Sequence, residues 1–315
     1  MRLQRLTHYL LQHRYLTMLF VLLVTFVPLI GVIGILIAAL VTLRKGVIEG
    51  ALLTLAATLP YAISFYFSEK EEGTLVVVWA AVLVAVLSNF STWIFAVILR
   101  RQANFSTVLQ LGALGGVLVI SVIHLAYPDV TSWWGNQLQS YYNEAKNAAS
   151  LLGNQVGNQE GKSQAMQLDA INITRQYATG FMVGGILLNA ILQLIAVRWW
   201  EAVVFYPRRL HKELQNIRLS QLAGGLFILG ILFSYWGNAV VLDIMPVPYL
   251  LFCGAGFSLI HYFFKQLDSK TSWSWFWLLV LYIAFFISMP TSIIFIAMIG
   301  LFDIWIDMRK RFRKV

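Results

Sequence analysis

Charge and cysteine are both scarce in this sequence. Of its 315 residues only 12% are charged, whereas 59% are hydrophobic. A soluble domain has about 25% charged residues because water must wet its surface, so a soluble globular fold is excluded. The single cysteine, Cys253, excludes an intrachain disulfide framework and any cysteine-based zinc or iron–sulfur cluster.

Sequence motifs of catalysis are also missing. No two histidines stand four residues apart, and there is no HExxH, GxSxG, GxGxxG or phosphate-binding GxxxxGK[ST] pattern. The five histidines are dispersed over the chain: His8, His13, His124, His211 and His261. We therefore expect no catalytic residues, no metal site, no cofactor and no enzymatic activity.

The net charge of +9, from 23 Lys and Arg against 14 Asp and Glu, raises the question of a nucleic-acid partner. A nucleic-acid-binding domain gathers its basic residues in one patch of a folded domain. Here they are scattered over short segments between apolar runs, as in loops that stay in the cytoplasm and contact anionic headgroups. The expected partner of these charges is the lipid bilayer, and no nucleic acid is expected.

Long apolar runs dominate the rest of the sequence. They cover residues 16–43, 47–67, 74–99, 107–127, 177–197, 221–242, 247–264 and 273–306. A bilayer core about 30 Å thick needs about 20 helical residues, so each of the middle six runs is predicted to be one span. The first and last runs are longer and contain Pro28 and Pro290, so each is either one kinked helix or two short helices. The prediction is an all-α polytopic membrane helical bundle, a single domain over residues 1–315, with about eight to ten membrane helices.

The distribution of positive charge favours the two-helix alternative for both long runs. If both form hairpins and the N-terminus is cytoplasmic, all but four of the 23 Lys and Arg lie inside, and the four outside are Lys70, Lys146, Lys162 and Arg175. If the first run crosses once, Arg2, Arg5 and Arg14 fall on the side opposite to most of the others. The positive-inside rule favours the hairpins, with both termini cytoplasmic in a bacterial inner membrane. Because each half is short, re-entrant pairs remain an alternative to full spans.

Two polar segments are long enough to fold outside the membrane. In residues 128–176, apolar side chains such as Leu138, Tyr141 and Tyr142 recur at helical spacing, which predicts an extracytoplasmic helical hairpin. Residues 198–219 are basic and place Leu210 and Leu214 on one helical face, which predicts a cytoplasmic amphipathic connecting helix along the headgroups. Both segments are candidate docking sites for a protein partner.

Amide side chains inside the apolar runs are the candidate ligand-binding residues: Asn89, Asn189, Gln193 and Asn238. Polar residues in a span are costly, so they face a partner or a cavity. Gln193 follows Asn189 by one turn on the same face. The alternative role is hydrogen bonding between helices, worth about 0.6 to 2 kcal/mol each.

Asp303 and Asp307 are one turn apart near the end of the last apolar run, with Arg309 beside them. Two carboxylates at this spacing could bind a cation or relay protons, or they could form the charge-paired end of a helix. Glycines four residues apart begin at Gly46, Gly112 and Gly180 and predict close helix packing.

Three stretches together resemble a known family. They are Leu43-Arg44-Lys45-Gly46, the Glu213–Leu219 stretch with Arg218, and the Gly300–Arg311 stretch with Asp303, Asp307 and Arg309. In these stretches the chain is similar to the YybS-like family of bacterial membrane proteins, which is distantly similar to the substrate-binding S components of energy-coupling-factor transporters. The resemblance implies a bacterial inner-membrane protein that binds a small molecule among its helices, with Arg44, Arg218, Asp303, Asp307 and Arg309 in a cytoplasmic motif that contacts a partner. The chain departs from S components in its extra outer hairpin, and only Gly34-x-x-x-Ala38 approximates their AxxxA coupling face.

Two functional hypotheses follow. The leading one is a membrane-embedded binding or transport component for a small solute, with a cavity that opens outward beneath residues 128–176 and is lined by the four amides. The competing one is a non-transporting interaction or scaffold protein in envelope assembly or regulation, which docks partners through 128–176 or 198–219. Because a nucleotide-binding motif is missing, active transport would need another subunit or an ion gradient.

Overall fold

The computed structural model describes residues 2–27, 30–67, 75–151, 160–207, 209–268, 274–289 and 291–312. Within these ranges all regular secondary structure is helical, which confirms the predicted all-α class. Four helices are long and apolar enough to cross a membrane, and they span residues 80–100, 105–126, 178–204 and 239–266. Six shorter apolar helices accompany them. The chain is an all-α membrane protein.

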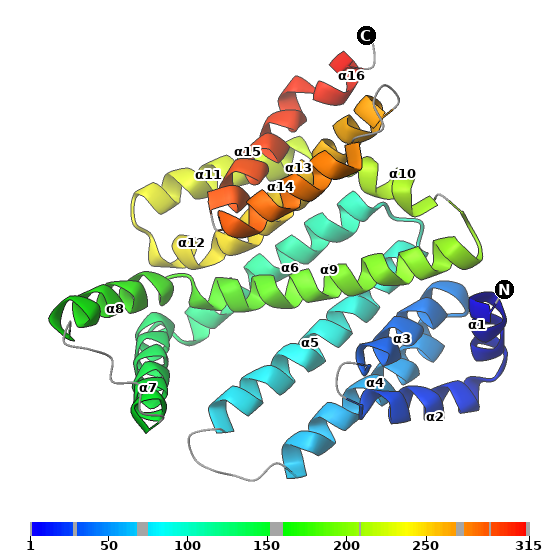
Figure 1. Ribbon diagram of the computed structural model, residues 1–315, viewed down its shortest axis with the longest axis horizontal. Coiled ribbons are helices and arrows are strands. Elements are labelled where there is room, and N and C mark those ends of the chain that lie inside the picture. Colours follow the sequence, from blue (N-terminus) through cyan, green and yellow to red (C-terminus); the bar gives the residue numbers. More distant parts are fainter. Residues whose placement is uncertain are drawn as a thin grey trace.

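Helices α1 to α5 form the N-terminal part of the bundle (Figure 1). Their bounds are α1 Arg2–Gln12, α2 Arg14–Thr25, α3 Val32–Arg44, α4 Val47–Phe67 and α5 Leu75–Arg100. The first apolar run is thus two short helices, α2 and α3, of 12 and 13 residues, as charge counting predicted. They pack closely, because a Cβ atom on Gly34 of α3 would lie 2.3 Å from Thr25 Oγ1 of α2. Pro28 lies outside the described residues.

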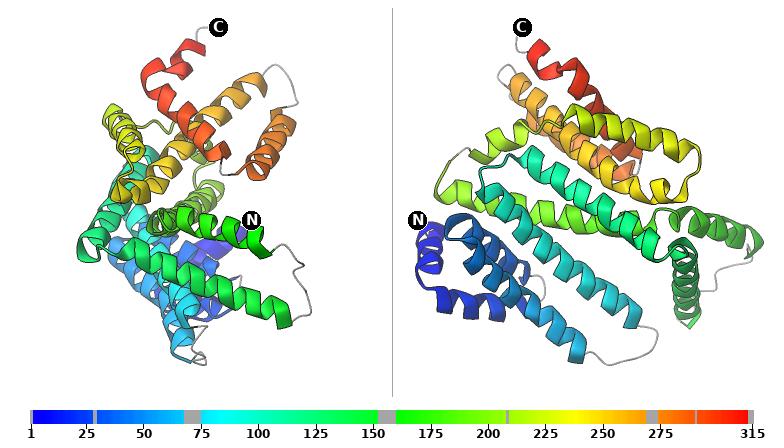
Figure 2. Two further views of the ribbon diagram at one scale, coloured as in Figure 1. Left: turned by 90° about the vertical axis from the view of Figure 1, so that its left-hand side faces the viewer. Right: turned by 180° about the vertical axis from the view of Figure 1, so that it is seen from behind.

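The centre of the bundle is α9 (Ala178–Val204), which packs against α3, α5, α6 (Phe105–Ala126) and α13 (Figures 1 and 2). Leu194 and Val197 of α9 are fully buried. The helix therefore joins the N-terminal helices to the C-terminal ones. It continues past the predicted end of its apolar run to Val204, because Ala202 and Trp200 remain buried against neighbouring helices.

The C-terminal part consists of α11 to α16. Their bounds are α11 Gln221–Tyr235, α12 Ala239–Ile244, α13 Pro246–Asp268, α14 Ser274–Ile287, α15 Thr291–Ile306 and α16 Met308–Phe312. The last apolar run is two helices, α14 and α15, as predicted, and Pro290 between them lies outside the described residues.

The predicted span over residues 221–242 is wrong in its end point. The chain turns at residues 236–238, and α12 then runs almost directly into α13 as one long apolar segment. Gly237 adopts φ +75°, a backbone conformation that favours glycine. Asn238 then caps α12 by accepting a hydrogen bond from Val241 N at 3.1 Å. The Gly-Asn pair was a turn signal inside an otherwise apolar run.

Glycine contacts hold several helix pairs together at backbone distance. A Cβ atom on Gly300 of α15 would lie 2.3 Å from Phe252 O of α13, so these two helices touch through their backbones. Of the predicted spacing pair on α9, Gly180 is tight, since its Cβ atom would lie 1.8 Å from Asp243 O, whereas Gly184 has no such neighbour within 4 Å. Spacing alone therefore identified the right helices but did not distinguish the contact glycine from its partner.

Two further helices lie in residues 128–176, where an extracytoplasmic helical hairpin was predicted. They are α7 (Val130–Leu151) and α8 (Glu160–Thr174), and the expected turn at 153–158 lies outside the described residues. Figure 1 shows this hairpin at the opposite end of the molecule from both termini.

The predicted helix over residues 198–219 is wrong as a single element. Residues 198–204 belong to α9, residues 209–215 form the short helix α10 (Arg209–Gln215), and residues 216–220 are not helical. Backbone oxygens of Gln215 and Ile217 accept hydrogen bonds from Arg309 instead of continuing a helical ladder. The segment is held against the bundle by side chains from distant parts of the chain.

Candidate functional site

Basic side chains that charge counting placed on one side of the membrane are interlinked at one end of the molecule. We call this the basic end, and it contains Arg44, Arg100, Arg198, Arg218 and Arg309. Arg100 of α5 donates to Thr42 O at 2.8 Å and to Lys45 O at 3.2 Å. These bonds satisfy carbonyl groups that the end of α3 leaves without a helical partner.

Arg198 attaches α10 to α9. Its side chain is 7% exposed and lies 2.5 Å from Glu201 Oε2 and 2.6 Å from Glu213 Oε1. Arg209 also donates to Glu213, at 2.9 Å. A buried arginine held by two carboxylates is fully compensated, so this cluster holds α10 in place.

Arg44 joins the end of α3 to the end of α9. Its Nη1 atom lies 3.7 Å from Glu201 Oε1 and donates to the Tyr206 hydroxyl at 3.2 Å. The guanidinium also stacks 4.0 Å from the centre of the Phe205 ring. Arg44 of the predicted cytoplasmic motif thus has three partners, all of them near the end of α9.

Arg309 is the most enclosed cation at the C-terminal side of the basic end. It donates to Gln215 O at 2.6 Å, to Ile217 O at 3.0 Å and to Ser258 Oγ at 3.2 Å, and its Nε atom lies 3.4 Å from Asp303 Oδ2. Burial lowers the pKa of the Arg309 guanidinium and Asp303 opposes this shift, so the side chain remains charged. Arg309 therefore fixes the non-helical segment after α10 to α13 and α15.

Asp303 and Asp307 each pair with cationic side chains. Asp307 adopts φ +49° and binds Arg218 at 2.6 Å and Lys310 at 3.0 Å. Burial raises the pKa of Asp307, but hydrogen bonds from Lys310 and Arg218 outweigh it and bring the pKa below its ordinary value. Asp303 accepts from Met308 N at 3.1 Å in addition to its pairing with Arg309. The arrangement supports the charge-paired helix end among the two predicted alternatives.

The four predicted amides do not converge. Gln193 is buried, accepts from Thr92 Oγ1 of α5 at 2.6 Å and donates to Asn189 at 3.4 Å, so these two lie together as predicted. Asn189 itself is exposed on the surface of α9, whereas Asn89 is buried in α5. Asn238 serves as the cap of α12 at the turn after α11. The Thr92–Gln193 contact supports hydrogen bonding between helices, and none of the four lines either cleft described below.

Sequence reasoning missed a buried acid–base pair at the other end of the bundle. Asp243 of α12 is 2% exposed, lies 2.8 Å from His124 Nε2 of α6, and accepts from Gly180 N of α9 at 2.8 Å. The signal was an acidic residue between two apolar runs, which a loop assignment concealed. Asp243 therefore joins three helices, because one of its carboxylate oxygens contacts His124 of α6 and the other accepts from Gly180 N of α9.

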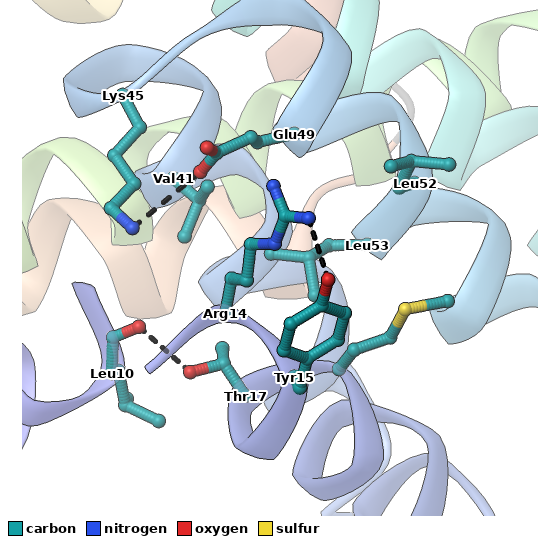
Figure 3. A pocket seen from close by; sticks show the side chains of 10 residues that line it. Leu10, Arg14, Tyr15, Thr17, Val41, Lys45, Glu49, Leu52 and Leu53 are labelled. Atoms are coloured by element: carbon teal, nitrogen blue, oxygen red, sulfur yellow. Dashed lines mark hydrogen bonds and ion pairs between the residues drawn. The ribbon is translucent and has the colours of Figure 1, made fainter. Parts of the chain in front are cut away.

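Two clefts in the described part of the chain lie at the basic end. One, of about 100 Å³, lies beside Arg218 and Asp303. The other, of about 120 Å³, lies between α1, α2, α3 and α4, and we call it the N-terminal cleft (Figure 3). Its polar lining consists of Arg14, Tyr15, Thr17, Lys45 and Glu49. Its apolar lining consists of Leu10, Met18, Val41, Leu52 and Leu53.

The charges of the N-terminal cleft are only partly satisfied. Arg14 donates to the Tyr15 hydroxyl at 2.7 Å and, in the described part of the chain, has no ion pair. Lys45 Nζ lies 3.5 Å from Glu49 Oε2, yet this oxygen is buried and accepts no hydrogen bond from described atoms. Figure 3 shows the Arg14 guanidinium and the Glu49 carboxylate turned toward the same space. The cleft therefore has cationic donors and one acceptor available to a ligand.

No family model, curated protein or solved structure matches the chain. The resemblance to the YybS-like family and to S components stays a prediction. Among the described residues, no group of three or more His, Cys, Asp or Glu side chains is arranged to hold a metal ion.

Proposed function

We propose that the protein is a membrane-embedded binding component and that its ligand carries an anionic group. The observation on which this depends is the N-terminal cleft, where Arg14 of α2 and Lys45, in the turn between α3 and α4, line one opening. Arginines elsewhere in the basic end are compensated by carboxylates or by several backbone oxygens. Arg14 has no ion pair among the described residues, and Lys45 has only the ion pair with Glu49 at 3.5 Å, so both cations are available for a phosphate or carboxylate.

This proposal moves the binding site from where the sequence placed it. The expected cavity opened outward beneath residues 128–176 and used Asn89, Asn189, Gln193 and Asn238. The bond between Thr92 and Gln193 and the capping by Asn238 give two of these amides structural roles. The basic end supplies the better ligand chemistry because its cleft contains Arg14, which has no ion pair among the described residues.

The proposed location is a bacterial inner membrane, with the basic end in the cytoplasm. Positive residues resist transfer across the membrane, and their gathering at one end supports this orientation. The N-terminal cleft then opens at the depth of the inner-leaflet headgroups. A transport role would require a coupling partner, and the Arg44, Arg218 and Arg309 region is the proposed contact.

A second function, docking of a protein partner, is favoured by the α7–α8 hairpin. Although this hairpin is largely polar, it exposes Tyr141 (60%), Met166 (77%) and Ile173 (62%). Exposed apolar side chains on an extramembrane element are typical of interaction surfaces. Crosslinking from cysteines placed at positions 141 and 166, in a background with Cys253 replaced, tests this function. Recovery of one stoichiometric protein would support it.

Ligand-dependent thermal stabilisation tests the binding function. Purified protein is heated with phosphate-bearing and carboxylate-bearing solutes and lipids, and the same series is repeated with Arg14→Gln and Asn189→Leu. Stabilisation that Arg14→Gln abolishes and Asn189→Leu preserves supports the N-terminal cleft. Arg101→Gln, which removes an exposed cation at the end of α5, is the matched charge control. The reverse pattern would return the site to the amides and contradict the proposal.

A further inference from the structure

The N-terminal cleft contains charges of both signs in a fixed arrangement. Arg14 and Lys45 supply donors, while Glu49 contributes a carboxylate 3.5 Å from Lys45 Nζ. A purely anionic ligand would satisfy the two cations but would be repelled by Glu49. The lining therefore selects for a ligand that brings a cation as well as an anion.

Glu49 adds a second, independent observation. Its Oε2 atom is buried and no described atom donates a hydrogen bond to it. A buried acceptor without a donor is costly, so a ligand with N–H groups gains from supplying one. Lys45 is close enough to attract the carboxylate but does not form a hydrogen bond with it.

The walls of the cleft extend into the surface that faces lipid. Met18 of α2 and Leu52 of α4 line the cleft and are 41% and 49% exposed. Further along the same helices, Leu19 and Leu55 are 53% and 52% exposed. An acyl chain lying on this surface would leave its headgroup at the charged opening.

We propose that the N-terminal cleft binds a phospholipid with a phosphoethanolamine headgroup. The phosphate diester accepts from Arg14 and Lys45, and the primary ammonium donates to Glu49. The headgroup is neutral overall but presents both charges, which matches a lining of two cations and one carboxylate. This inference rests on the proposed function, because it names the ligand class for the same cleft.

Native mass spectrometry of the purified full chain, titrated with lipids in detergent, tests the inference. The probes are phosphatidylethanolamine, phosphatidylglycerol and phosphatidylcholine with identical acyl chains. We expect phosphatidylethanolamine to bind about tenfold more tightly than the other two, because phosphatidylglycerol lacks the ammonium and phosphatidylcholine has no N–H donor. Glu49→Gln should remove most of this preference, and Arg14→Gln should weaken all three lipids.

The N-methylated series, from phosphatidylethanolamine through its dimethyl form to phosphatidylcholine, keeps the test independent of any variant. On the unmodified protein, affinity should fall with each loss of N–H donors. Equal binding across this series would overturn the headgroup assignment, while loss of binding in Arg14→Gln would still support an anion site. If no lipid or phosphate-bearing solute binds in an Arg14-dependent way, both this inference and the proposed function fail.

Soluble phosphoethanolamine separates a lipid from a free solute. We expect it to compete with the lipid only weakly, because it lacks the acyl chains that contact Met18 and Leu52. Competition at an affinity equal to that of the lipid would overturn the lipid assignment and leave a soluble zwitterion as the ligand. Lys310→Gln, which removes an exposed cation from α16, should bind all probes as the unmodified protein does.

Discussion

Arg309 and Arg14 lie at the same end of the molecule, and their surroundings are opposite. Arg309 is buried and bonded to Gln215 O, Ile217 O and Ser258, with Asp303 beside it. Arg14 is exposed, bonded to one tyrosine hydroxyl, and lines a cleft. The difference separates a charge that holds the fold together from a charge that we propose is available to a ligand, although both follow the predicted positive-inside pattern.

The largest effect should come from Arg309→Met. This change removes the buried cation that pairs with Asp303 and the donor to two backbone oxygens, which typically costs about 3 to 5 kcal/mol. Thermal unfolding in detergent, monitored by tryptophan fluorescence, measures the loss. The matched control is Lys310→Gln, whose exposed ion pair should contribute at most about 1 kcal/mol. Equal stability of the two variants would contradict a structural role for Arg309.

His124→Leu extends the comparison to the end of the bundle opposite the basic end. The substitution removes one of the two described hydrogen-bond partners of the buried Asp243 carboxylate and leaves only the backbone N–H of Gly180. We expect the free energy of unfolding to fall by about 1 to 3 kcal/mol. His211→Leu, at an exposed histidine of α10, is the control and should stay within about 0.5 kcal/mol. If His124→Leu left the free energy of unfolding unchanged, this pair would not stabilise the contact of α6 with α12.

Asp307 should give a smaller, pH-dependent effect. Because its pKa is lowered in the folded protein, its contribution to stability is present above the ordinary carboxyl pKa of about 3.9. The contribution is lost as the pH falls through the lowered folded-state value. The unfolding temperature of the unmodified protein should therefore drop more between pH 6 and pH 3 than that of Asp307→Asn, in which asparagine also tolerates the positive φ. Identical pH profiles would show that the ion pairs with Arg218 and Lys310 do not stabilise the fold.

Arg14→Gln should have the smallest effect on stability. Its side chain is exposed and has no ion pair among the described residues, so the free energy of unfolding should change by no more than about 0.5 kcal/mol. Ligand binding should nevertheless be lost. Unfolding measurements without ligand check the first expectation, and the lipid titration checks the second. A destabilised Arg14→Gln protein would remove the distinction between the two arginines.

Much of the helical framework follows from local sequence. The run at 47–67 matches α4 in both of its bounds, and the two long runs divide into α2 with α3 and α14 with α15. Hydropathy finds such segments because a span is apolar along its whole length, whether its side chains face lipid or pack against other helices. It failed at residues 236–238, where one glycine with positive φ and one capping asparagine end a helix inside an apolar run.

The candidate site followed much less from the sequence. Asn189 and Gln193 were placed together by helical periodicity, but no local signal says that Thr92, far away in the chain, satisfies Gln193. Asp243 was unrecognised because its partners, His124 and Gly180, come from two other helices. A polar residue in a span predicts that a hydrogen-bond partner lies nearby, but it does not indicate which residue that partner is.

By itself, the sequence determined that the chain is a membrane protein and where most of its helices lie. These properties depend on the free energy of transferring each segment from water to lipid, which is set by the residues of that segment alone. Only the tertiary structure decided which cations are compensated, which glycines touch a backbone, and that Arg14, Lys45 and Glu49 line one cleft. Those outcomes depend on distances between segments that are far apart in the chain, and composition and periodicity do not encode such distances.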